Sequence, residues 1–89
     1  MTDLYSLHLI FSIDGWDKAQ SLVAENDRVV FLQDAVYLLQ KPLKTNNDLI
    51  YGRYIDCNAR NLTPYVGYET IDDEQWLELS EHANNILSW

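Results

Sequence analysis

Short apolar runs recur along the chain and predict strands. The clearest begins at Arg28, where Val29, Val30, Phe31 and Leu32 are consecutive and apolar instead of alternating with polar residues. That pattern is typical of a strand covered on both faces, as in a parallel sheet. The predicted strands are Leu4–Phe11, Arg28–Gln33, Leu49–Ile55 and the weaker Val66–Ile71.

Each predicted strand is followed by a segment that favours a helix. In the last of these, Asp72 and Gln75 match the capping-box pattern. Its apolar face carries Trp76, Leu79, Ala83 and Ile86. The predicted helices are Gly15–Glu25, Ala35–Gln40, Asn58–Leu62 and Asp73–Leu87, and Lys41–Asp48 is an irregular polar loop. The alternation predicts an α/β fold, a small, mostly parallel four-stranded sheet with helices on both faces, in a single domain over residues 1–89.

Composition narrows the class of protein. The chain has 89 residues, of which 47% are hydrophobic, as expected of a folded globular protein. Its formal net charge of -8 disfavours direct binding to nucleic-acid phosphates, which rewards clustered Lys and Arg. The single cysteine excludes an internal disulfide, and neither a signal peptide nor a membrane span is visible. We therefore expect a cytoplasmic protein.

Cys57, the only thiol, is the candidate catalytic residue. It follows a predicted strand, where a helix N-terminus would lower its pKa and favour a nucleophilic or persulfide-carrying thiolate. The alternative is an inert small residue, because Asp56 beside it opposes thiolate formation and no Lys or Arg lies within two residues. Both interpretations stay open at this point.

Acidic residues follow the predicted strands, at the edge where functional groups gather in parallel sheets. They could form paired carboxylates or a magnesium site, but Asp is also a preferred N-cap, and capping is the favoured interpretation. His8 is expected to be a hydrogen-bonded structural group, and His82 to be solvated. No spacing of Cys and His resembles a metal site and no glycine-rich phosphate loop is present, so neither metal nor cofactor is predicted. The strand-end residues are Asp14, Asp34, Asp56 and Asp72.

Four segments that span almost the whole chain share one family pattern. They are Leu7-His8-Leu9-Ile10-Phe11, the run Val29 to Tyr37, Ala59-Arg60-Asn61-Leu62-Thr63, and Ile71-Asp72 followed by an amphipathic helix and Trp89. In this order they resemble the DsrH/TusB family of small α/β sulfur-relay subunits. The resemblance implies TusC- and TusD-type partners in a dimer of heterotrimers. That complex relays persulfide sulfur, through a TusE-type acceptor, toward 2-thiolation of the tRNA wobble uridine, or serves sulfur oxidation in the Dsr branch.

Departures from the family pattern indicate the role of this chain. Ala19 stands where some DsrH members carry a cysteine, Ala35 replaces the usual Gly, and the stretch between Tyr54 and Ala59 is short. Cys57 matches no family cysteine, and the family's sulfur-accepting cysteine lies in the TusD/DsrE-type subunit. The leading hypothesis is a non-catalytic subunit of a tRNA-thiolation relay that does not itself contact tRNA. The alternatives are a sulfurtransferase that uses Cys57, and a homo-oligomeric binding module whose surplus aromatic residues anchor protein contacts.

Overall fold

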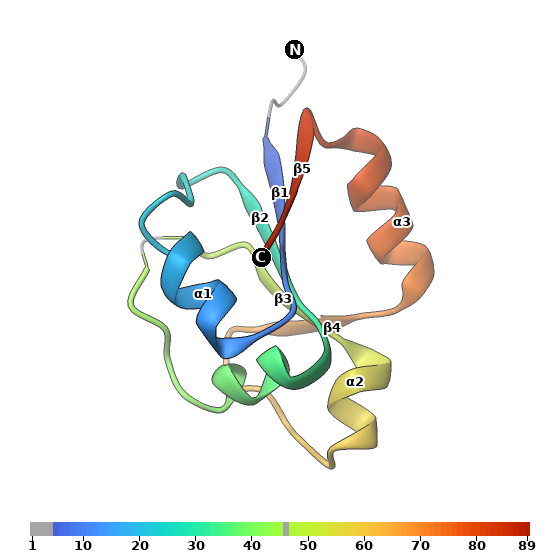
Figure 1. Cartoon of the computed structure of the whole chain (residues 1–89). Helices are drawn as coiled ribbons and strands as arrows, with labels where there is room; N and C mark the ends of the chain where they lie inside the picture. The colour runs from blue at the N-terminus through green and yellow to red at the C-terminus, as the bar shows by residue number, and fades with distance from the viewer. Residues whose placement is uncertain (1–4, 46) are drawn as a thin grey trace.

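The computed structural model describes residues 5–45 and 47–89, so Leu4 of the first predicted strand and Asn46 of the predicted loop lie outside the described residues. The described residues form one sheet of five parallel strands (Figure 1). The strands are β1 (Ser6–Ile10), β2 (Arg28–Phe31), β3 (Ile50–Arg53), β4 (Glu69–Ile71) and β5 (Asn85–Ser88). Their order across the sheet is β4-β3-β2-β1-β5, which leaves β4 and β5 at its edges.

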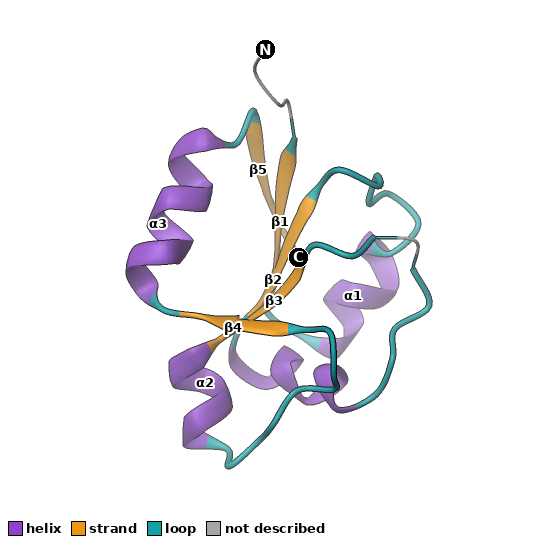
Figure 2. Ribbon diagram, turned by 180° about the vertical axis from the view of Figure 1, so that it is seen from behind, coloured by secondary structure: helices purple, strands orange, loops and turns teal. Residues whose placement is uncertain are grey.

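Helical segments cover both faces of this sheet, as predicted. The helix α1 (Ile13–Ala19) and the 3-10 helix η1 (Gln33–Gln40) pack on one face, and α3 (Asp73–His82) lies across the other (Figure 2). The short helix α2 (Tyr54–Ala59) follows β3 and packs against η1. Within the described part of the chain, no helix has the length and apolar character needed to cross a membrane.

β2 has the two-sided burial that its continuous apolar run predicts. Val29 and Phe31 belong to the core cluster beneath α1 and η1, whereas Val30 and Leu32 belong to the cluster on the α3 face. Successive side chains of a strand point to opposite faces, so a strand buried on both faces needs apolar residues at every position. This prediction is confirmed.

β5 overlaps the end of the last predicted helix, Asp73–Leu87, and was not predicted as a strand. α3 ends at His82 instead of Leu87, and Asn85–Ser88 pairs in parallel with β1, with Ile86 opposite Leu7. Without β5, the inner strand β1 would be an edge with apolar side chains on both faces. Pairing satisfies the backbone groups of β1, which a longer helix would leave exposed. The sheet therefore has five strands instead of the predicted four.

α1 also differs from its prediction. It spans Ile13–Ala19 instead of Gly15–Glu25. The side-chain amide of Asn47 donates to the carbonyl oxygens of Ala24 and Asp27, both at 2.7 Å. These carbonyl groups are thereby held in a loop by a residue from another part of the chain, and the helix ends before it reaches them.

The end of β3 and the start of β4 also differ from their predicted positions. α2 begins at Tyr54 instead of Asn58, so β3 ends at Arg53. β4 starts at Glu69 instead of Val66, because Gly67 adopts a positive φ of 104° in a turn that precedes the strand.

Candidate functional site

The carboxyl edge of the sheet brings two of the four predicted acidic residues, Asp34 and Asp56, together with Asp73 around two arginines. The guanidinium of Arg53 donates to both carboxylate oxygens of Asp73, at 2.8 and 3.0 Å, and lies 3.5 Å from Asp56. Arg60 donates to Asp34 at 2.8 Å and lies 3.6 Å from Asp56. Hydrogen bonds from Arg53 lower the pKa of Asp73. Each of these carboxylates is thus paired with an arginine. No group of three or more His, Cys, Asp or Glu among the described residues is placed to hold a metal ion.

Helix capping, the favoured interpretation of the strand-end aspartates, holds at one position. Asp72 and Gln75 form the predicted capping box, in which each side chain accepts a hydrogen bond from the other residue's backbone N–H, at 2.8 and 2.9 Å. At α1 the cap is Ser12, which accepts from Gly15 N, so the prediction for Asp14 is wrong. Asp34 is not a cap either, because η1 begins after Leu32 without a side-chain cap.

Asp56 was also predicted to cap a helix, and instead it is the buried centre of this edge. It lies in the first turn of α2, whose N-cap residue is Arg53. Its carboxylate accepts a hydrogen bond from Gln33 N at 2.8 Å. Gln33 has a φ of 53°, a left-handed conformation that costs free energy for a residue with a side chain. Asp56 therefore stabilises the sharp turn between β2 and η1.

Cys57 lies inside the core that α1 and η1 cover. It is the fourth residue of α2, and 2% of its surface is exposed. Its sulfur packs against Gly52, where an added methyl carbon would lie 3.1 Å from Sγ. Burial, followed by the charge of Asp56, raises the pKa of the thiol and outweighs the opposing charge of Arg60. This environment favours the protonated, inaccessible thiol, and the role of Cys57 in catalysis stays a prediction.

A buried polar network links β1 to Trp89. His8, which is 2% exposed, contacts Asp27 Oδ2 through Nε2 at 3.0 Å and Trp89 Nε1 through Nδ1 at 3.1 Å. An indole N–H can only donate, so Nδ1 accepts and Nε2 carries the proton that is donated to Asp27. The expectation that His8 is a hydrogen-bonded structural group is confirmed, although its partners could not be read from the sequence.

Asp27 completes this network and is itself buried, with 7% of its surface exposed. Burial opposes ionisation, but hydrogen bonds from the backbone of Ala24 and Ser6 and from His8 outweigh it and lower the pKa of Asp27. The network thus fixes the start of β2 beside β1. The contacts of the network are those of a structural core, because they join backbone groups and side chains of separate segments.

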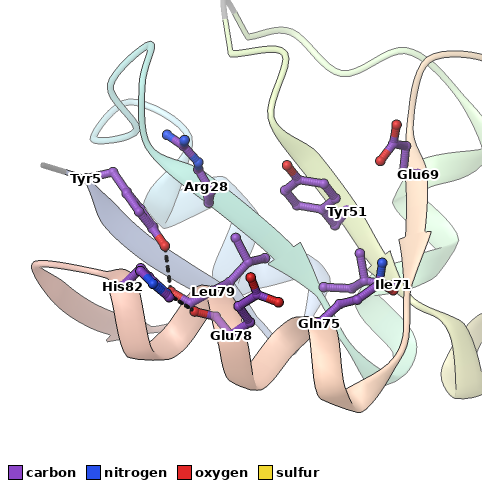
Figure 3. A pocket seen from close by; sticks show the side chains of 9 residues that line it. All are labelled: Tyr5, Arg28, Tyr51, Glu69, Ile71, Gln75, Glu78, Leu79 and His82. Carbon is purple, nitrogen blue, oxygen red and sulfur yellow. Dashed lines mark hydrogen bonds between the residues drawn. The ribbon is translucent and has the colours of Figure 1, made fainter. Parts of the chain in front are cut away.

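A groove lies on the other face, between α3 and the sheet (Figure 3). Its volume is about 540 Å³. Tyr51, Ile71 and Leu79 supply its apolar surface, and carboxylates from β4 and α3 stand along it. The exposed His82, predicted to be solvated, stands at one end. Sequence reasoning missed this groove, because its residues come from four strands or strand ends and one helix.

Two comparisons by sequence found no relative, and a comparison of structures found the fold. No protein-family model matches the chain, and no curated protein matches it in sequence. The structure is similar to the crystal structure of the YchN protein from E. coli, with a TM-score of 0.72 and 14% sequence identity, over 98% of this chain and 100% of that chain. At this identity the likeness concerns the fold alone. The chain therefore has a DsrE/DsrF/DsrH-like α/β fold, the fold class that its sequence predicts.

Proposed function

We propose that this chain is a non-catalytic subunit of a cytoplasmic sulfur-relay complex that acts in 2-thiolation of the tRNA wobble uridine. The observation that carries the proposal is a buried, lone thiol in a DsrE/DsrF/DsrH-like fold. A sulfur carrier needs an accessible thiolate. Cys57 is 2% exposed and burial raises its pKa, so the accepting thiolate must come from another subunit.

The chemistry assigned to that other subunit is a thiol exchange. The thiolate of a TusD-type partner attacks the terminal sulfur of a donor persulfide, the donor's S–S bond breaks, and the donor leaves as a thiolate. The partner then holds the persulfide and passes the sulfur to a TusE-type acceptor. This chain and a TusC-type partner complete the dimer of heterotrimers. With its net charge of -8, this chain leaves contact with tRNA to other subunits.

An exposed surface on α2 and η1 supports a docking role. Tyr37 on η1 is 46% exposed, and Tyr54 and Ile55 on α2 are each 52% exposed. The guanidinium of Arg60 lies 5.9 Å from the centre of the Tyr37 ring. Tyrosine and arginine are enriched at the centres of protein interfaces. Such a surface lies beside the buried thiol without exposing it.

Affinity purification of the tagged chain from its native host tests the assembly. We expect two further small α/β chains to be recovered in equal amounts with it, one of them with a cysteine directly after a strand. Recovery of the chain alone, or only with copies of itself, would contradict the proposal and favour the homo-oligomeric module.

Intact-mass analysis of the purified complex after incubation with a persulfide donor tests the chemistry. The proposal expects a gain of sulfur mass on the partner's cysteine and none on this chain. The matched variants are Cys57→Ser here and a Cys→Ser change in the partner, of which only the second should abolish tRNA thiolation. Sulfur found on Cys57, together with loss of relay in Cys57→Ser, would identify this chain as the sulfurtransferase.

A further inference from the structure

We propose that the groove between α3 and the sheet binds an arginine or lysine side chain presented by a partner protein. This inference concerns the face opposite to Cys57 and does not depend on the sulfur-relay proposal. It rests on the shape of the groove, its unpaired charges and its apolar surface.

The groove exists because α3 covers its face of the sheet incompletely. α3 runs from the β4 edge toward the β5 edge and has no fully buried residue. Trp76, Leu79 and Ala83 contact the sheet core but remain partly exposed. The resulting hollow of about 540 Å³ is large enough for a long side chain and part of its neighbours.

The two carboxylates that line the groove lack an ion-pair partner among the described residues. Glu69 on β4 and Glu78 on α3 both line it, and neither carboxylate forms an ion pair with another described residue (Figure 3). Arg28, also in the lining, is already engaged, because it lies over the Tyr5 ring at 4.3 Å and donates to the carbonyl oxygen of Asn26. Glu69 and Glu78 thus outnumber Arg28 in the lining, and neither is paired with it, whereas each acid of the carboxyl edge forms an ion pair with an arginine.

Unpaired carboxylates are common on this acidic surface, but these two border an apolar surface. Ile71 and Leu79 offer aliphatic contacts for the methylene stem of a long cationic side chain. The ring of Tyr51 offers a cation–π contact, and its hydroxyl has no hydrogen-bond partner among the described residues, so it can accept from a bound N–H. Arg28 could attract an anion, but it already lies over the Tyr5 ring and is outnumbered by Glu69 and Glu78, which would repel one. An uncharged ligand would bury these two carboxylates without a counter-charge. A long cationic side chain is the occupant whose charge and apolar stem match these groups.

A matched pair of small probes tests the proposal on the full chain. N-acetyl-leucyl-arginine amide and its citrulline analogue have nearly the same shape, but citrulline is uncharged. In ¹⁵N NMR titrations we expect the arginine probe to shift the amide signals of Tyr51, Ile71 and Leu79 saturably, with an affinity at least fivefold higher than that of the citrulline probe. The double variant E69Q/E78Q should remove this preference. The control variant E74Q/E81Q, which makes the same change of charge on α3 outside the groove, should keep it.

Several results would overturn the inference. Equal binding of the two probes, or no saturable binding, would contradict it. So would a preference for the arginine probe that survives in E69Q/E78Q. A preference that E74Q/E81Q also removes would assign the effect to net charge alone. Shifts of the same signals that grow with protein concentration and vanish in E69Q/E78Q would identify a second copy as the occupant and would also refute it. Circular dichroism melting of each variant checks its folding, and the single variants E69Q and E78Q replace the double variant if it does not fold.

Discussion

The two faces of the sheet are covered in different ways. On the α1 and η1 face, Val29, Phe31 and Ile50 from the sheet meet Trp16, Ala35 and Leu39 from the helices, and each is at most 4% exposed. On the α3 face the sheet contributes buried residues, but α3 itself contributes none. The first face is thus a closed core that contains the only thiol, and the second leaves a groove with unpaired charge. The difference indicates that the first face contributes more to stability than the second.

The largest expected effect comes from the closed core. Phe31→Ala should lower the free energy of unfolding by about 3–5 kcal/mol, because it removes a large side chain with no exposed surface. Leu79→Ala on α3 should cost less than half as much, since the side chain is partly exposed and solvent can fill the space. Urea unfolding of both variants measures this difference. Equal costs on the two faces would refute the comparison.

The second-largest effect on the free energy of unfolding is expected in the buried polar network of His8, Asp27 and Trp89, and this effect should depend on pH. Asp27→Asn should destabilise the protein by about 1–3 kcal/mol at pH 7. The carboxylate now accepts hydrogen bonds from backbone N–H groups, and the introduced amide nitrogen cannot accept them. The folded-state pKa of Asp27 is lowered, so its stabilising effect is fully present above the unfolded pKa of about 3.9 and is lost as pH falls through the folded value.

Urea unfolding at pH 7, 5 and 3 checks this prediction. The gap between the wild type and Asp27→Asn should be constant from pH 7 to 5 and narrow at pH 3. Asp17→Asn, an exposed change on α1, is the control and should show no such gap. A gap that stays unchanged at pH 3 would show that the ionised carboxylate does not stabilise the network.

Gly15→Ala separates the effect of helix propensity on stability from the effect of tertiary packing. In an isolated helix this substitution is favourable by about 1 kcal/mol. Here the added methyl carbon would lie 2.6 Å from the backbone oxygen of Trp89, so the chain end must move, and we expect a loss of about 1–2 kcal/mol. Thermal unfolding beside the exposed control Asp17→Ala measures it. A rise in melting temperature for Gly15→Ala would show that Trp89 does not pack closely on α1.

The smallest effect is expected in the groove. E69Q/E78Q should change the free energy of unfolding by less than about 0.5 kcal/mol, because neither carboxylate forms an ion pair within the described structure. Chemical denaturation of this variant and E74Q/E81Q gives the comparison. A loss above 1 kcal/mol that is specific to E69Q/E78Q would mean that the groove acids stabilise the fold instead of serving a partner.

The candidate sites could be predicted only in part. Cys57 and the strand-end acids are visible as residue types, and Asp56 next to Cys57 already indicated an unfavourable place for a thiolate. The burial of Cys57 could not be predicted from the sequence, because it depends on how α2 folds back over the core. The capture of Asp34, Asp56 and Asp73 by two arginines also depends on which strand ends become neighbours.

The local sequence pattern was sufficient to predict an element where the side chains of that segment themselves supply its core contacts or its capping hydrogen bonds. The uninterrupted run Val29–Leu32 specifies a strand buried on both faces, and Asp72 with Gln75 satisfies the first backbone groups of α3 without outside help. The tertiary structure decided what depends on distant partners. Asn47 holds the carbonyl groups of Ala24 and Asp27 in the loop that follows α1. Asn85–Ser88 forms a strand because it satisfies backbone groups at the side of β1 that would otherwise be unpaired. The groove belongs to the same class, since it exists only where α3 and the sheet meet.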